Sequence, residues 1–75
     1  MHIGQLIKQE LANQGRSVVW FAKQISCSRA CTYKLFNQPS IETDRLLLIS
    51  NLLGVDFFKV YSAELKEIRK LMDKK

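Results

Sequence analysis

The sequence predicts an all-α fold: five short helices in a compact bundle, followed by a C-terminal helical tail. Apolar residues recur at intervals of three and four along most of the 75 residues. Serine, threonine, aspartate and glycine stand where helices begin and end. No segment alternates apolar and polar residues as a half-buried strand does. These observations together predict helices throughout.

The first two predicted helices are separated by a glycine and a serine. An amphipathic helix over about residues 2–14 has four apolar residues on one face: Ile3, Leu6, Ile7 and Leu11. Gly15 is a good left-handed stop beyond it, and Ser17 is the expected N-cap of a helix over residues 17–25. The core face of that second helix consists of Val18, Phe21, Ala22 and Ile25. Trp20 lies off this face, so it either packs on a neighbouring element or stays partly exposed.

A third helix follows a short turn, with Ser28 as its N-cap, and Pro39 ends it. One side of this helix, residues 28–37, carries small and apolar residues: Cys31, Thr32 and Leu35. An opposite arc of roughly 140° carries longer, polar and cationic residues. That arc consists of Arg29, Ala30, Tyr33, Lys34 and Asn37. Phe36 falls at the margin and is expected to pack inward.

Two further helices are predicted in the C-terminal half. Thr43 is the expected cap of a helix from Asp44 to Leu53, and Gly54 stops it. Asp56 can cap a short helix from Phe57 to about Tyr61.

We therefore predict a domain over residues 1–62 and a helical tail over residues 63–75. In the fourth helix three apolar residues can fill the core: Leu46, Ile49 and Leu53. Leu48 and Leu52 then lack an obvious partner, and the tail adds a second apolar stripe. A homodimer interface is expected at five residues: Leu48, Leu52, Leu65, Ile68 and Met72. Alternatively, the tail folds back and covers Leu48 and Leu52 within one chain.

Charge placement points to a polyanionic partner. The net charge is +5, and residues 1–38 contain five basic residues but a single acid, Glu10. From Leu11 to Ile41 there is no acid at all. An acid-free basic stretch suits nucleic acid, whereas the alternative is a solvated surface with chance asymmetry.

Other classes are disfavoured by what the sequence lacks. The longest apolar run, Val18 to Ala22, is far shorter than the roughly 20 residues of a membrane span, so no membrane association is expected. The first residues lack a leader pattern, so we expect a cytoplasmic protein with reduced cysteines. Cys27 is expected to be buried and Cys31 at most partly exposed. We expect no metal, because His2 is remote from both cysteines, and also no catalytic pair, cofactor or small-molecule ligand.

The order of helices and caps resembles the phage-repressor-like, or Xre-type, family of helix-turn-helix DNA-binding proteins. The resemblance covers about residues 3–61 and depends on an ordered set: Ser17, Phe21-Ala22, Ile25, Ser26-Cys27-Ser28, Leu35, Asn37, Pro39-Ser40-Ile41-Glu42-Thr43 and Leu53-Gly54-Val55-Asp56. It implies that the helix of residues 28–37 enters the major groove of duplex DNA and that the helix of residues 17–25 braces it. The implied base-reading residues are Arg29, Ala30 and Lys34. The residues implied to lie near phosphates are Ser17, Tyr33 and Asn37.

The sequence departs from the family at two positions that shape this region. Ser26 stands where the family has a turn glycine, so it must tolerate a less favourable backbone angle or a reshaped turn. Thr32 stands where a branched apolar residue is usual. Two side chains also have structural alternatives: the Tyr33 ring can pack on the protein, and Asn37 can cap the helix.

We thus expect a sequence-specific DNA-binding protein, most simply a transcriptional regulator that binds two half-sites as a homodimer. The alternative is a protein-interaction module on the same fold. Its partner surface would include Trp20, Leu48 and Leu52. The two readings differ at the Arg29–Lys34 face, because an interaction module does not need that face to be basic and acid-free.

Overall fold

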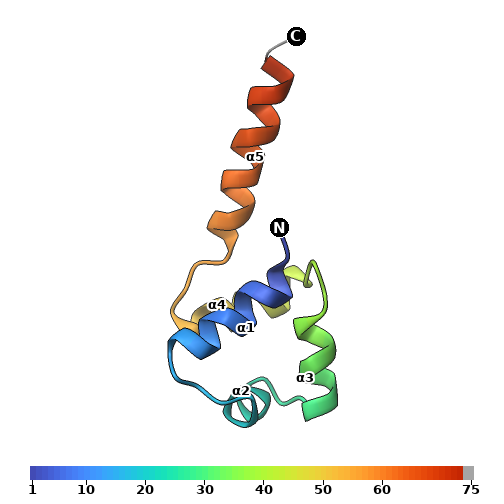
Figure 1. The fold of residues 1–75 in the computed structure, drawn as a ribbon, viewed down its shortest axis with the longest axis vertical. Coiled ribbons are helices and arrows are strands. Elements are labelled where there is room, and N and C mark those ends of the chain that lie inside the picture. Colours follow the sequence, from blue (N-terminus) through green and yellow to red (C-terminus); the bar gives the residue numbers. More distant parts are fainter. Residues whose placement is uncertain (74–75) are drawn as a thin grey trace.

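The computed structural model describes residues 1–73, so residues 74–75 of the predicted tail lie outside the described part. It contains five helices: α1 (Ile3–Asn13), α2 (Val18–Gln24), α3 (Arg29–Phe36), α4 (Thr43–Leu53) and α5 (Phe58–Asp73). Helices α1 to α4 form a body around one core, and α5 projects from that body as a rod (Figure 1). The molecule therefore measures 48 × 20 × 20 Å. No strand occurs in residues 1–73, which confirms the all-α prediction.

The core is built from the faces that the apolar spacing predicted. Its buried residues come from all four helices of the body and from the segment before α5: Ile3, Ile7, Leu11, Phe21, Ala22, Ile25, Thr32, Leu35, Phe36, Leu46, Ile49, Leu53 and Phe57. The ring of Phe36, expected to pack inward, is 2% exposed and stacks on Phe21 with 5.9 Å between ring centroids. This stack joins α3 to α2 at the centre of the body.

Three helices end in the same way, with a left-handed residue and a backbone bond that reaches five residues back. The left-handed residues are Gly15 at φ 68°, Ser26 at φ 54° and Gly54 at φ 67°. The bonds run from Arg16 N to Leu11 O at 2.9 Å, from Cys27 N to Ala22 O at 2.9 Å and from Val55 N to Ser50 O at 3.1 Å. The expected stops at both glycines are confirmed. Ser26 keeps the turn and adopts the less favourable angle.

The helix starts agree with the sequence at three places and differ at one. The side chains of Ser17, Ser28 and Asp56 accept the expected bonds from Trp20 N, Cys31 N and Phe58 N, each at 3.0 Å. The predicted Thr43 cap is wrong, because α4 already includes that residue and Glu42 occupies the N-cap position. The Glu42 carbonyl accepts from Leu46 N at 2.9 Å, so the first helical bond forms one residue earlier than expected.

The predicted break between a short fifth helix and a tail is also wrong. Residues 58–73 form one continuous helix, since the segment between Tyr61 and Leu65 contains no glycine or proline to interrupt it. Its first turn packs on the body, but every residue from 62 to 73 is exposed. The tail does not fold back in this structure. Leu52 is instead partly buried against the core, while Leu48 is 50% exposed.

Candidate nucleic-acid interface

The C-terminal end of α3 is held by the N-terminal end of α1. Ile3 N donates to Pro39 O and Gly4 N donates to Gln38 O, both at 2.9 Å. The Gln5 side-chain amide donates to Phe36 O at 3.1 Å. Free amides at a helix start thus satisfy carbonyls at and just beyond a helix end, where the opposite helix dipoles also attract. This junction fixes the position of α3 on the body.

Gly4 makes this junction possible, and the sequence analysis did not single it out. It is buried, and a Cβ at this position would lie 2.7 Å from Gln38 O and closer still to the carbonyl oxygens of Leu35 and Phe36. Only glycine fits without a backbone shift. The signal in the sequence was a glycine in the first turn of a helix, where it is a poor helix former and needs another reason to be present.

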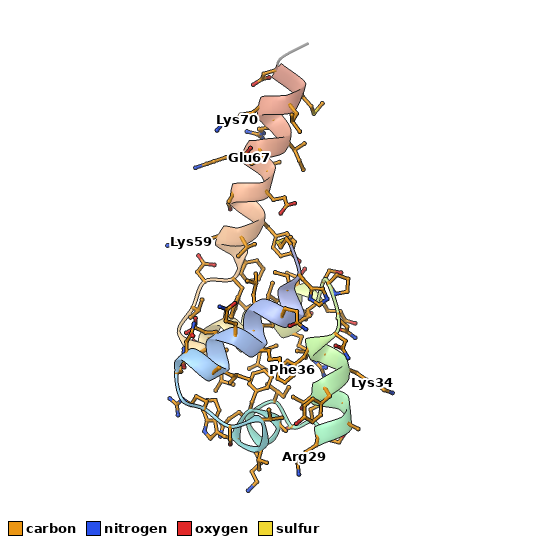
Figure 2. The ribbon with its side chains drawn as sticks, viewed as in Figure 1. Arg29, Lys34, Phe36, Lys59, Glu67 and Lys70 are labelled. Carbon is orange, nitrogen blue, oxygen red and sulfur yellow. The ribbon has the colours of Figure 1, made fainter. Side chains whose placement is uncertain are left out.

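The outward face of α3 carries the predicted base-reading residues. Arg29, Ala30 and Lys34 are all exposed. Figure 2 shows Arg29 and Lys34 pointing away from the body, with Arg29 at the end opposite the tip of α5. Within residues 1–73 one ion pair lies under 4 Å, and it joins Lys70 to Glu67 on α5. Neither cation of α3 is therefore neutralised by a carboxylate of the described chain.

The inner face of α3 is tightly fixed. Thr32 is fully buried, and its hydroxyl donates to Ser28 O at 2.9 Å, which accounts for a polar residue at this core position. Leu35 is 1% exposed. An eight-residue helix has little stability of its own, so these contacts define its orientation.

The three residues predicted to lie near phosphates are exposed, and each of them also has a structural role. The Tyr33 ring meets Phe36 edge-on, with 6.1 Å between centroids, and remains 46% exposed. Asn37 occupies the C-cap position of α3, and Ser17 caps α2. The structure therefore brings Tyr33 and Asn37 together with the basic face, whereas Ser17 belongs to the start of the neighbouring helix.

Two further cations flank this region. Arg16 lies over the Trp20 ring at 4.2 Å from its centroid, and Trp20 itself is partly buried against the core. This contact answers the open question about Trp20 and holds a guanidinium beside the start of α2. Arg45 of α4 lies close enough to the Cys31 thiol on α3 to lower its pKa. The sequence offered no signal for this proximity, because it joins residues on separate helices.

The two thiols lie beside the start of α3. Both are partly buried, so the prediction that Cys27 is buried is wrong; it lies in the turn, which remains open to solvent. A hydrogen bond with Cys27, aided by Arg45 and Lys34, lowers the pKa of the Cys31 thiol. The same hydrogen bond, together with partial burial, raises the pKa of the Cys27 thiol. Cys31 is therefore the more readily ionised of the pair.

No helix within residues 1–73 is both long and apolar enough to cross a bilayer. The same residues contain no group of three or more histidine, cysteine or acidic side chains arranged to hold a metal ion. Comparison with protein-family models, curated proteins and solved structures finds no match for this chain.

Proposed function

We propose that this chain binds duplex DNA in a sequence-specific manner, with α3 in the major groove. The observation that carries the proposal is the outward face of α3: it is basic, free of acids and mounted on a helix whose inner side is fixed. The major groove is about 12 Å wide and admits an α-helix. A fixed helix with unpaired cations on its free side meets the geometric and electrostatic needs of such docking.

Within this proposal each exposed residue of α3 has a defined role. Arg29 donates two parallel hydrogen bonds to a guanine, and Ala30 contacts a thymine methyl group. Lys34, more than one turn onward, reaches a base or a phosphate. Phosphate contacts come from Ser17, Tyr33 and Asn37, with Arg16 as an additional candidate because its stack on Trp20 places it beside α2.

The resemblance to the Xre-type family supports a transcriptional regulator of that family. The alternative, a protein-interaction module, depends on Trp20, Leu48 and Leu52 as an apolar surface. Two of these, Trp20 and Leu52, are partly buried against the core of their own chain. This favours DNA over a protein partner at the body.

The test is selection of bound sites from random duplex DNA, followed by a salt titration on the selected site. If about four to six phosphates are neutralised, log affinity falls against log salt with a slope of about −0.9 per contact. A flat response up to physiological salt, or no binding at low salt, would refute the proposal.

Two matched variants test whether binding depends on the α3 face or only on the net charge of the chain. Lys34→Ala should weaken binding, whereas Lys66→Ala removes the same charge from the polar side of α5 and should leave affinity nearly unchanged. Equal losses for the two variants would mean that binding follows net charge and not α3.

A further inference from the structure

An apolar stripe runs along α5 from Tyr61, which is partly buried against the core, into the exposed segment of residues 62–73. We call the α5 stripe the four residues Tyr61, Leu65, Ile68 and Met72. Leu65 and Ile68 are each 49% exposed, and Met72 is 62% exposed. Helical spacing places Lys59, Glu67 and Lys70, which are labelled on α5 in Figure 2, on the other side of the helix. A helix with one apolar side normally buries that side against another element.

The spacing of the α5 stripe is the same in both directions along the chain. Its residues follow one another at intervals of four, three and four. An antiparallel copy therefore matches it residue by residue: Tyr61 faces Met72 of the second copy, and Leu65 faces its Ile68. Such a seam, with a near-heptad repeat, is typical of paired helices.

The base of the stripe ends in a hollow that suits the tip of a second helix. This hollow, about 350 Å³, lies between α4 and α5 and is lined by Ile41, Thr43, Leu46, Phe58 and Tyr61. In an antiparallel pair Met72 of the second copy lies above it. Methionine is unbranched and flexible, so it fills an irregular apolar gap well.

We propose that α5 pairs antiparallel with α5 of a second copy of this chain. A parallel pair would place Glu64 beside Arg69 of the second copy, but exposed ion pairs contribute little. The base of the α5 stripe faces the start of α4, because Tyr61 lines one hollow together with Thr43 and Leu46 of the body. A parallel partner would bring its own body into that space. Steric exclusion therefore outweighs the charges and selects the antiparallel arrangement.

The size of this seam predicts a reversible dimer. With about 100 Å² for each fully covered leucine, isoleucine or methionine, the stripes of two copies supply under about 1,000 Å². Specific interfaces begin near that area, so we expect dissociation in the micromolar range.

If α3 binds DNA as proposed, the pairing decides where a dimer carries its two DNA-binding faces. This consequence rests on the proposed function, whereas the pairing itself does not. Arg29 and the α3 face lie at the end of the molecule opposite the tip of α5 (Figure 2). An antiparallel dimer carries its two α3 helices at opposite far ends. Such a dimer binds two separate duplex segments and cannot read two adjacent half-sites on one duplex.

The first test measures mass without DNA. Sedimentation of the full chain from about 1 to about 100 µM should show a monomer–dimer equilibrium. Ile68→Asp should raise the dissociation constant at least tenfold, whereas Lys66→Asp, on the polar side of the same helix, should not. A monomer throughout this range would refute the pairing. So would a monomer that binds vesicles of anionic lipid through Ile68, because a membrane surface would then be the occupant.

The second test determines orientation by disulfide trapping in a Cys27→Ser, Cys31→Ser background. A mixture of Tyr61→Cys and Met72→Cys chains should form a cross-linked heterodimer on oxidation, because those positions face each other. Met72→Cys alone should stay uncross-linked. Efficient self-cross-linking of Met72→Cys would demonstrate a parallel pair and overturn the proposal.

A third experiment tests whether one dimer can hold two duplexes at once. An immobilised duplex with bound protein should capture a second, labelled duplex, and Ile68→Asp should abolish capture. If single duplexes bind but an intact dimer captures no second duplex, the antiparallel placement is wrong. If no duplex binds at all, the proposed function fails while the mass and cross-linking results still stand.

Discussion

Helices α3 and α5 are both amphipathic, yet they are held in opposite ways. The inner face of α3 is buried in the core, and its end is bonded to α1. Only the first turn of α5 packs on the body, and residues 62–73 are exposed all round. The exposed face of α3 is basic, whereas α5 exposes its apolar stripe as well as its polar side.

The two exposed faces differ in whether burial would stabilise them. Exposed cations are solvated and need no cover, so the face of α3 is compatible with a monomer in water. Exposed apolar side chains at helical spacing gain free energy from burial, about 25 cal/mol per Å². The orientation of α3 is therefore fixed without a partner, whereas the apolar stripe of α5 gains stability only when another surface covers it.

The substitution with the greatest predicted effect disrupts the junction between α1 and the end of α3. Gly4→Ala forces a methyl group against three carbonyl oxygens and should lower the free energy of unfolding by about 3 kcal/mol, as for severe overpacking. Urea denaturation measures this loss. The control is Ala12→Gly on the exposed side of α1, which should cost about 1 kcal/mol through helix propensity alone. Similar losses for both would show that the junction tolerates a side chain.

A somewhat smaller effect, on DNA binding, is expected for a substitution on the exposed face of α3. Arg29→Ala should cost about 1–3 kcal/mol of binding free energy on a selected duplex and much less on a random one. The reason is that a bidentate contact with guanine carries sequence information, whereas a phosphate contact does not. Parallel titrations on the two duplexes make the comparison. Equal losses would reassign Arg29 to the phosphate backbone.

A substitution in the turn before α3 should stabilise the protein. Ser26 adopts φ 54°, so Ser26→Gly should remove left-handed strain and raise the free energy of unfolding by about 1 kcal/mol. Gly15→Ser, the reverse substitution at an equivalent turn, is the control. It should lower the free energy of unfolding by a similar amount, because Gly15 is also left-handed, at φ 68°. Thermal unfolding of both variants tests the pair. A destabilised Ser26→Gly protein would show that the serine makes a compensating contact.

The smallest effect concerns the thiols at the start of α3. The pKa of Cys31 is lowered and that of Cys27 is raised, so Cys31 should be alkylated a few-fold faster near neutral pH. The advantage should shrink as pH rises, because Cys27 then ionises as well. Mass spectrometry of peptides after brief alkylation resolves the two sites. Faster modification of Cys27 at neutral pH would contradict this order.

Local chemistry in the sequence determined much of this protein. Apolar spacing predicted the inward faces of α1 to α4, and Ser17, Ser28, Gly15 and Gly54 marked helix ends, because capping depends on neighbours within a few residues. The exposed arc of α3 followed from helical periodicity alone. The continuity of α5 was also a local property, and the absence of a helix breaker after Tyr61 was the overlooked signal.

The way in which these elements pack together depends on contacts between residues far apart in the sequence. The need for glycine at position 4 arises from carbonyl oxygens more than 30 residues away in the chain. The proximity of Arg45 to Cys31, which lowers the pKa of that thiol, likewise joins separate helices, and the direction in which α5 leaves the body depends on how its first turn packs there. Sequence spacing records which side of a helix is apolar but not what lies opposite that side. Contacts between distant segments are set by the packing of the whole core, and no local pattern contains them.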